Sequence, residues 1–376
     1  MKTFLASILL FLIAGIATGQ GKPPDVKALE IGQPAPAFTL PGTDDKNYSL
    51  SDFDDYDFLV VLFTCNHCPT AQAYEDKFIA IVDKYRQEGV GFVAISPNSN
   101  TALSLAECGY SDLDDSFESM KIRARDKGYN FPYLFDGEDH NVSIAYGPQA
   151  TPHAFVFDKD RKLKYRGRID DTENPYIEPE TTDLINALDA LLSGNDPEVE
   201  TTKTFGCSIK WPWKGEWAET LRKQWEEEAV VLEETDLEGI KEIIGNDTEN
   251  LRLVNVWATW CGPCVIEFPE LMKIFRMYSG REFELVTLSA DKPGNIEKVQ
   301  KFLEDQDAAC TNYIFNSDDT YAMIEAVDKE WQGTLPYTML IKPGGEIIFK
   351  HTGIIDPLEV RREIIDVLGR YYADNE

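Results

Sequence analysis

Basic residues are scarce in this chain of 376 residues. Lysine and arginine number 36 against 66 aspartates and glutamates, which gives a formal net charge of −30 at pH 7. A surface that binds nucleic acid needs clustered basic side chains to release counterions from the phosphates, so the composition argues against such a partner. We expect the acidic clusters Asp112–Asp115 and Glu226–Glu228 to solvate helix ends or faces.

Cysteine is also sparse. The chain has seven, an odd number, and two close pairs account for four of them. The remaining three, Cys108, Cys207 and Cys310, are too few for a dense disulfide framework in so long a chain. Because hydrophobic residues make up 43% of the sequence, two packed cores are expected to supply the stability.

The sequence has no hydrophobic run long enough to cross a membrane. One shorter run lies near its start. Lys2 precedes an apolar stretch, Phe4–Ile16, which ends in the small residues Ala17, Thr18 and Gly19. This pattern predicts a secretory signal, residues 1–19, and an exported protein in the periplasm or outside the cell. An uncleaved, membrane-anchored start would have a similar pattern and stays open; we expect no other membrane association.

Cofactor motifs are missing too. No nucleotide or flavin motif stands out, and the residues after the two Cys-x-x-Cys pairs are Pro69 and Val265, where a haem-attachment motif has histidine. We therefore expect no cofactor.

The two Cys-x-x-Cys pairs each follow an apolar run that predicts a buried strand, 58–64 and 251–257. The pairs are Cys65-Asn66-His67-Cys68 and Cys261-Gly262-Pro263-Cys264. A thiolate at a strand-to-helix junction faces unpaired helix amides, which lower its pKa towards neutral pH. The sequence thus predicts two tandem dithiol sites.

Strands alternate with helices on both sides of an irregular polar and aromatic segment, 193–214, which predicts α/β architecture with a linker. For the first half we expect strands 58–64, 91–97 and 132–135, helices 68–86, 113–127 and 180–192, and a hairpin 153–167. For the second half we expect strands 230–232, 251–257 and 283–291, helices 216–229, 236–244, 295–305 and 357–372, a helix ending near 277, and a hairpin 337–353.

This order of elements, with a Cys pair opening a helix and a proline before the closing hairpin, resembles the thioredoxin fold in both halves. The resemblance implies two tandem thioredoxin-like domains, each a central mixed β-sheet flanked by helices. We place a redoxin-like domain at 28–192, a linker containing Cys207 at 193–215 and a second domain at 216–376.

The second half, with Trp260 before the Cys pair and Glu267 after it, resembles the TlpA/ResA-like thioredoxins. The resemblance implies that Cys261 is the nucleophile and Cys264 the resolving thiol. Glu267 is placed to exchange a proton with Cys264, or is an ordinary acid of a first helical turn. Leu335-Pro336 resembles the family's cis-proline loop, which offers backbone groups to the substrate chain, and Thr151-Pro152 matches it in the first half.

The first half opens with residues 32–53, which resemble the AhpC/TSA redoxins, including the peroxiredoxins. Their reactive position would be Cys68, but Cys65 stands where those peroxidases carry threonine, and Val61 where they carry proline. The pair therefore favours disulfide exchange, with His67 stabilising a thiolate as in DsbA-like oxidases, unless His67 is an exposed loop residue. Thiol peroxidase activity, with the second domain as reductant, is an alternative.

Cys207 lies in Phe205–Trp211, which resembles the segment that closes many redoxin-like domains of the CNHC type. It could resolve a disulfide with Cys65 or Cys68, or be a free cysteine in an aromatic segment. We expect Cys108 and Cys310 to be structural, and no metal site. A copper-binding or partner-binding module of the same fold is the non-enzymatic alternative, because paired thiolates suit Cu(I).

The sequence thus predicts an exported thiol-disulfide oxidoreductase with two dithiol sites, between which electrons could pass. Its expected partners are protein thiols and disulfides and an unidentified redox partner.

Overall fold

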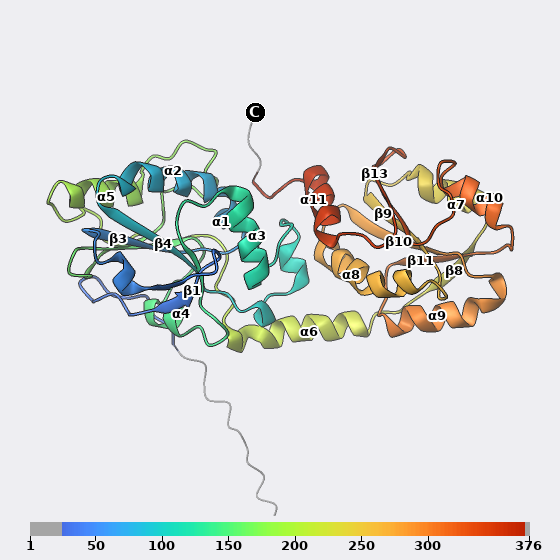
Figure 1. Ribbon diagram of the computed structural model, residues 1–376, viewed down its shortest axis with the longest axis horizontal. Helices are drawn as coiled ribbons and strands as arrows, with labels where there is room; N and C mark the ends of the chain where they lie inside the picture. The colour runs from blue at the N-terminus through green and yellow to red at the C-terminus, as the bar shows by residue number, and fades with distance from the viewer. Residues whose placement is uncertain (1–24, 373–376) are drawn as a thin grey trace, which may run out of the picture.

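The computed structural model describes residues 25–372, in which two α/β units lie side by side and helix α6 (Gly215–Glu226) runs along both (Figure 1). The signal predicted at residues 1–19 lies outside this range. Within residues 25–372, no helix combines the length and apolar character that a membrane crossing requires.

The first unit is built on a five-stranded mixed sheet in the order β5-β4-β3-β6-β7. Strands β3, β4 and β5 are parallel, and β6 and β7 are antiparallel to their neighbours. Nearly every residue of β3 and β4 is buried, as expected for parallel strands covered on both faces. The strands are β1 Thr39–Pro41, β2 Asn47–Ser49, β3 Phe58–Phe63, β4 Val90–Ser96, β5 Tyr133–Phe135, β6 His153–Phe157 and β7 Leu163–Gly167.

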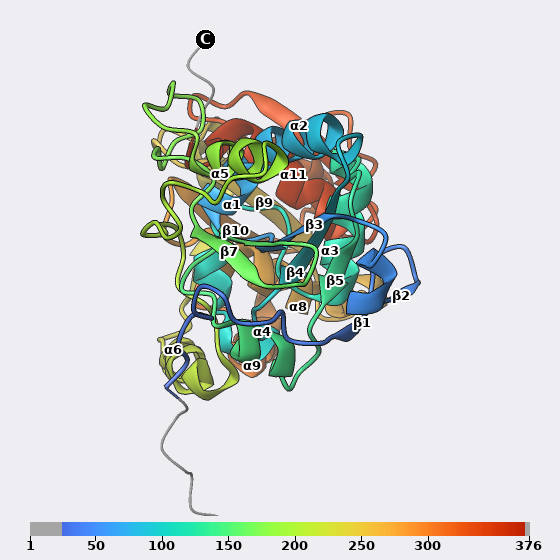
Figure 2. The ribbon, with the colours of Figure 1, turned by 90° about the vertical axis from the view of Figure 1, so that its left-hand side faces the viewer.

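Helices cover both faces of this sheet. Figure 2 shows α2 and α5 above it and α4, with the β1–β2 ribbon, below it. The two faces carry separate apolar clusters, one centred on Phe78 and Leu184, the other on Phe63 and Tyr146. The helices are α1 Pro69–Ala73, α2 Glu75–Arg86, α3 Phe117–Lys127, α4 Asn141–Tyr146 and α5 Asp183–Leu192; short 3₁₀ turns η2 (Asn100–Ala102) and η3 (Leu105–Cys108) follow β4.

The second unit has a six-stranded mixed sheet in the order β13-β12-β9-β10-β11-β8. Strands β8 to β11 are parallel, and β12 and β13 are antiparallel. Its strands are β8 Leu232–Thr235, β9 Leu251–Trp257, β10 Phe283–Ser289, β11 Thr311–Phe315, β12 Tyr337–Ile341 and β13 Ile347–Thr352. Its helices are α7 Leu237–Gly245, α8 Gly262–Tyr278, α9 Ile296–Asp305, α10 Thr320–Val327 and α11 Pro357–Leu368.

The predicted elements are present, with four differences. The expected strand 230–232 lies further along the chain, as β8 at Leu232–Thr235. The expected helix 68–86 is two helices, α1 and α2, that meet at Tyr74, whose hydroxyl donates to Thr172 O at 2.6 Å. The expected helix 113–127 begins only at Phe117, because the preceding residues form a buried loop. Strand β11 and helix α10 were not predicted.

The interpretation of Asp112–Asp115 as a solvated cluster is wrong. Asp112 is 4% exposed and Asp115 is fully buried, because each accepts hydrogen bonds from buried partners. The other acidic cluster, Glu226–Glu228, is exposed as predicted.

The two units share a contact built by the loop around η3 and the C-terminal end of α8. Cys108 packs within the apolar cluster of the second unit. Tyr278 Oη donates to Ser111 O at 3.0 Å, and Arg281 Nη1 donates to Gly109 O at 2.9 Å. The last turn of α8 is therefore anchored on the first unit.

Candidate functional site: two cysteine pairs

Cys65, Cys68 and Cys207 meet at the carboxyl end of β3. Cys65 is the second residue after strand β3, and Cys68 is the N-cap residue of helix α1. The Thr151–Pro152 peptide is cis, and Thr151 Oγ1 lies 3.2 Å from Cys65 Sγ. The Cys207 amide donates to Cys68 Sγ at 3.3 Å. These three cysteines are free thiols, and together with Ala71 they form a small cluster of their own.

The surroundings of Cys68 favour its thiolate. Burial raises the pKa of the Cys68 thiol, but hydrogen bonds from Cys207 and Cys65, the charge of His67 and the Ala71 amide outweigh burial and hold the pKa well below the usual value. Burial raises the pKa of Cys65 well above the usual value, and its hydrogen bond to Cys68 adds to that shift. The hydrogen bond to Cys68, and then burial, raise the pKa of Cys207. The surroundings thus favour a thiolate at Cys68 over one at Cys65 or Cys207.

His67 is buried and ion-paired, which rules out the exposed-loop alternative. Its Nδ1 lies 2.6 Å from Asp115 Oδ2, and both side chains are almost completely buried. Asp115 also accepts from the amide of Asn66 at 2.8 Å, and from Asn98 Nδ2 at 2.8 Å. Burial lowers the pKa of His67, but the charge of Asp115, its hydrogen bond and the charge of Cys68 together outweigh burial, and the pKa is raised. Conversely, His67 lowers the pKa of Asp115 against the effect of burial.

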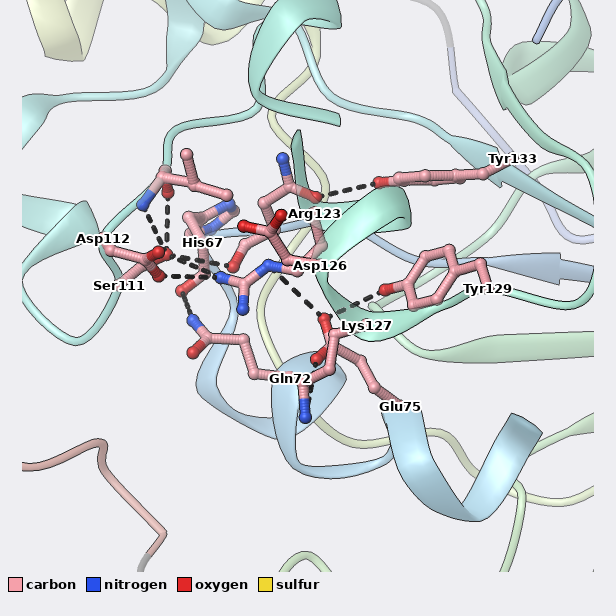
Figure 3. Close-up of polar contacts among 12 residues, drawn as sticks. His67, Gln72, Glu75, Ser111, Asp112, Arg123, Asp126, Lys127, Tyr129 and Tyr133 are labelled. Atoms are coloured by element: carbon pink, nitrogen blue, oxygen red, sulfur yellow. Dashed lines mark hydrogen bonds and ion pairs between the residues drawn. The ribbon is translucent and has the colours of Figure 1, made fainter. Parts of the chain in front are cut away.

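A second buried network adjoins this site (Figure 3). Gln72 Nε2 donates to His67 O at 3.1 Å. Arg123 lies between Asp112, at 3.2 Å, and Glu75, at 3.6 Å. Arg370 of the second unit joins the two parts of this network, because it donates to Gln72 Oε1 and, at 2.8 Å, to Asp112 Oδ1.

One donor set could hold a metal ion. Cys65, His67 and Asp115 each offer an atom within 4.8 Å of the others. His67 Nδ1 and Asp115 already form a close ion pair, and the other ring nitrogen, Nε2, is buried without a hydrogen-bond partner in the described residues. A metal bound by Nδ1 and Asp115 would have to break that ion pair, and a metal bound by Nε2 would keep the pair but find only Cys65 as a further ligand in this set, so the set fits thiolate positioning better than metal binding.

The second pair opens helix α8. Cys261 and Cys264 are joined by a disulfide, and the Cys264 amide donates to Cys261 Sγ at 3.3 Å. Leu335–Pro336 is a cis peptide, and Leu335 packs against the apolar cluster that contains both cysteines. The predicted site residues of the second half thus lie within one region.

Glu267 is buried one turn beyond Cys264. Its Oε1 accepts from Asn255 Nδ2 at 2.9 Å and its Oε2 from the Ile355 amide at 3.0 Å. Burial raises the pKa of Glu267, and these two hydrogen bonds offset only part of that shift. The carboxyl group therefore takes up a proton more readily than an ordinary glutamate does.

The two sites differ in what surrounds them. Beside the second pair, Trp260 is 65% and Ile266 68% exposed, and Val265 is also exposed. Trp257, by contrast, is buried against Phe268. The cysteines themselves are buried in both pairs, and at the first site His67 is buried as well.

Several residues were missed by sequence reasoning. Asp115 looked like part of a solvated acidic cluster, and Asn98 and Asn255 carried no motif. Cys108 and Cys310, predicted to be structural, are buried and unpaired, and burial raises the pKa of Cys310 to about 12.

Comparison with known proteins gives two family matches in tandem. The AhpC/TSA family model matches residues 31–166, and the Redoxin family model matches residues 246–363. The thiol-disulfide oxidoreductase ResA of Halalkalibacterium halodurans is 29% identical over 131 residues, which are 34% of this chain and 68% of that protein. The ResA of Oceanobacillus iheyensis is 33% identical over 95 residues, 25% of this chain and 45% of that protein.

Solved structures are similar over parts of the chain. A hypothetical protein from Sinorhizobium meliloti has 31% identity and a TM-score of 0.44, covering 49% of this chain and 96% of that chain. A putative thiol:disulfide interchange protein DsbE from Chlorobium tepidum has 25% identity and a TM-score of 0.28, covering 33% of this chain and 83% of that chain.

Two mixed sheets, each with a Cys-x-x-Cys pair at the start of a helix and a cis-proline beside it, define a tandem thioredoxin-fold protein of the oxidoreductase class. The chain belongs to the thioredoxin-like superfamily, with an AhpC/TSA unit followed by a redoxin unit related to ResA. It is a thioredoxin-like thiol-disulfide oxidoreductase.

Proposed function

We propose that this enzyme is exported and exchanges electrons with protein thiols and disulfides through two dithiol sites. The observation that carries the proposal is the Cys261–Cys264 disulfide at the start of α8, beside a cis-proline and exposed apolar side chains. The domain limits 28–192, 193–215 and 216–376 are part of this proposal.

At the second site the reduced form would act by two displacements. The Cys261 thiolate attacks a substrate disulfide, and one substrate thiolate leaves. Cys264 loses its proton to Glu267 and attacks Cys261 Sγ, which releases the second substrate thiolate and restores the Cys261–Cys264 disulfide. Leu335 and Pro336 would hold the substrate backbone beside Cys261. The raised pKa of Glu267 suits it to accept that proton near neutral pH.

At the first site the attacking group would be Cys68, whose thiolate is favoured by its surroundings. Cys65 would then close the Cys65–Cys68 disulfide. The positive charge of His67 favours the reduced form, which makes the disulfide more oxidising. Thr151 and Pro152 would take the backbone-binding role here.

The test is the reduction potential of each pair, measured in the variant that lacks the other pair (C261S/C264S or C65S/C68S) against glutathione and dithiothreitol buffers. We expect well-separated potentials, with the first pair more oxidising. Equal, strongly reducing potentials would overturn the oxidising assignment of the first pair, and a first pair that forms no disulfide would remove its dithiol role.

Electron transfer between the sites is a further part of the proposal. Helix α8 carries its cysteines at the first turn but contacts the first unit at its last turn. Its 17 residues span about 25 Å at 1.5 Å per residue, which sets Cys261 about that far from this contact. In this proposal the units separate to let the sites meet, or a small dithiol carries the electrons. A Cys68–Cys261 disulfide trapped in the C65S/C207S/C264S variant would support direct transfer, and failure to trap one under any condition would contradict it.

Peroxide reduction by the first unit is the second candidate. The low pKa of Cys68, which precedes Pro69 in an AhpC/TSA unit, favours it. Stoichiometric hydrogen peroxide should then form sulfenic acid at Cys68 and not at Cys65, detected by dimedone labelling and peptide mass spectrometry. Equal labelling, or none, would remove this candidate.

Export is tested by expressing the full chain in a Gram-negative host. The mature protein should be found in the periplasmic fraction and begin at Gln20. Retention in the cytosol with Met1 in place would contradict the signal assignment.

A further inference from the structure

The segment 205–209 of the chain lies on the cis-proline loop of the first site. Thr151 and Cys207 form an antiparallel bridge in which the Thr151 amide donates to Cys207 O at 3.0 Å. The Cys207 amide points the other way, to Cys68 Sγ at 3.3 Å. One residue of the segment therefore pairs with the residue before the cis-proline and also contacts the sulfur of the reactive thiol.

Both ends of this segment are fastened to the first unit. On one side, the Thr202 amide donates to Arg166 O at 3.1 Å beside strand β7. On the other side, the Lys210 amide donates to Asn98 Oδ1 at 2.9 Å, and the Ser99 amide donates to Lys210 O at 2.8 Å. Ile209, between these anchors, is 2% exposed. The segment is thus held as a strap across the thiols.

Gly206 permits the close approach of the strap to the loop. Its φ is +112°, a conformation that other residues rarely adopt. A Cβ added there would lie 2.0 Å from Thr151 O, which is an impossible contact. Any side chain at position 206 must therefore move the strap away from Thr151.

The second site has no such cover. Within residues 25–372, no backbone segment pairs with Leu335, the residue before the second cis-proline. The Cys pairs of both sites are buried, but exposed Trp260 and Ile266 lie beside the second pair, whereas the strap lies against the first. The same fold thus offers an open peptide-binding edge in one unit and a filled one in the other.

We propose that residues 205–209 occupy the substrate-peptide position of the first site as a built-in peptide, with Cys207 as its exchanging thiol, so that protein substrates are left to the second site. This inference rests on the proposed function and narrows it at the first site, whose substrate is then not a separate protein. That substrate is a segment of the same chain, and a small disulfide is the oxidant in the exchange.

The exchange is balanced with a low-molecular-weight disulfide as oxidant. The Cys68 thiolate attacks one sulfur of the disulfide, forming a mixed disulfide and releasing one small thiolate. The Cys207 thiol loses its proton and attacks Cys68 Sγ, which releases the second small thiolate and forms a Cys68–Cys207 disulfide. Two protein thiols are oxidised and one small disulfide is reduced to two thiols.

The first experiment traps this bond. The C65S/C261S/C264S variant is treated with one equivalent of hydroxyethyl disulfide and digested for mass spectrometry. We expect a Cys68–Cys207 cross-link in most molecules and two equivalents of released mercaptoethanol. A mixed disulfide that stays on Cys68 without reacting further would overturn the assignment of Cys207.

The second experiment opens the strap without changing a thiol. In the C261S/C264S background, insulin disulfide reduction is measured for the parent, G206A and the control G194A. Gly194 also has positive φ, +80°, but its added Cβ would meet nothing within 4 Å. We expect G206A to raise the insulin rate at least 10-fold and G194A to leave it unchanged.

The outcomes separate this inference from the proposed function. A parent that reduces insulin as fast as G206A, with both proteins folded by circular dichroism, overturns the built-in peptide and leaves the dithiol role intact. A first site that reacts with neither insulin nor hydroxyethyl disulfide in any variant overturns the dithiol role itself. If G206A does not fold, the trapping experiment decides alone.

Discussion

At the scale of single residues, the reactivity of the first site depends on the buried pair His67–Asp115. The pKa of His67 is raised, so its contribution to stability is present below the unfolded value near 6.5 and is lost as pH rises through the higher folded value. The pKa of Asp115 is lowered, so its contribution is present above the unfolded value near 3.9 and is lost as pH falls. The pair thus stabilises the fold most between these limits.

The substitution D115N should raise the pKa of Cys68. A neutral amide can no longer hold a charged His67, and the thiolate loses that favourable charge. We expect a shift of about one pKa unit, equivalent to about 1.4 kcal/mol. It is measured by thiolate absorbance at 240 nm against pH in the C261S/C264S variant. The control is D114N, whose side chain accepts hydrogen bonds from the amide and hydroxyl of Ser116; equal shifts in both variants would contradict the role of Asp115.

The substitution E267Q should slow disulfide reduction at the second site. Glutamine cannot accept the proton of Cys264, so insulin reduction at pH 7 should fall at least about 10-fold, at the lower end of acid–base contributions. In the parent, the rate should also decline at acid pH, with a midpoint above that of an ordinary glutamate because the pKa is raised. E270Q is the control, since Glu270 is partly exposed and pairs with Lys273. If the insulin reduction rate of E267Q still declined at acid pH as the parent's rate does, the role of Glu267 as proton acceptor would be contradicted.

At the scale of elements, the sequence predicts those helices and strands that a local pattern of residues encodes. Buried parallel strands are apolar runs, so β3, β4 and β9 were found within one or two residues. Tyr74, where the expected helix breaks, donates its hydroxyl to Thr172, which lies 98 residues further on. The loop before α3 is buried because Asp115 meets His67, 48 residues away. Such contacts leave no local pattern, and for the same reason Asp115 was missed while both Cys pairs were found.

The substitution G147A should detach the chain near Lys27 from helix α4. Gly147 caps α4 with φ +67°, and an added Cβ would lie 1.9 Å from Lys27 O. Gly128 caps α3 with a similar φ, +64°, but has open space. We expect G128A to cost about 1 kcal/mol from backbone conformation alone and G147A about 3 kcal/mol, measured by urea unfolding. Equal losses would show that the contact with Lys27 adds nothing.

At the scale of the whole molecule, Asp112 holds the two units together. It pairs with Arg123 of its own unit at 3.2 Å, with Arg370 at 2.8 Å and with Arg362 at 3.4 Å. Burial raises the pKa of Asp112, but the arginines outweigh burial and lower it to about 2. The contribution of Asp112 to folding stability is present above its pKa in the unfolded chain, near 3.9, and is lost as pH falls towards 2.

The substitution D112N should uncouple the units. It leaves buried Arg123 without one of its anionic partners and removes the charge that holds Arg362 and Arg370, at a cost of about 3–5 kcal/mol. Calorimetry should show two separate transitions in place of one. The control D126N removes a more exposed partner of Arg362, worth less than about 1 kcal/mol. One unchanged transition in D112N would contradict this role.

The position of Arg370 also bears on the order in which the protein can be completed during synthesis. Arg370 donates to Gln72, which in turn donates to the carbonyl of His67. A ribosome releases the CNHC loop some 300 residues before it releases this arginine. While the chain is being translated, the first site therefore lacks a group that later holds its loop, and it reaches its final form only after residue 370 has emerged.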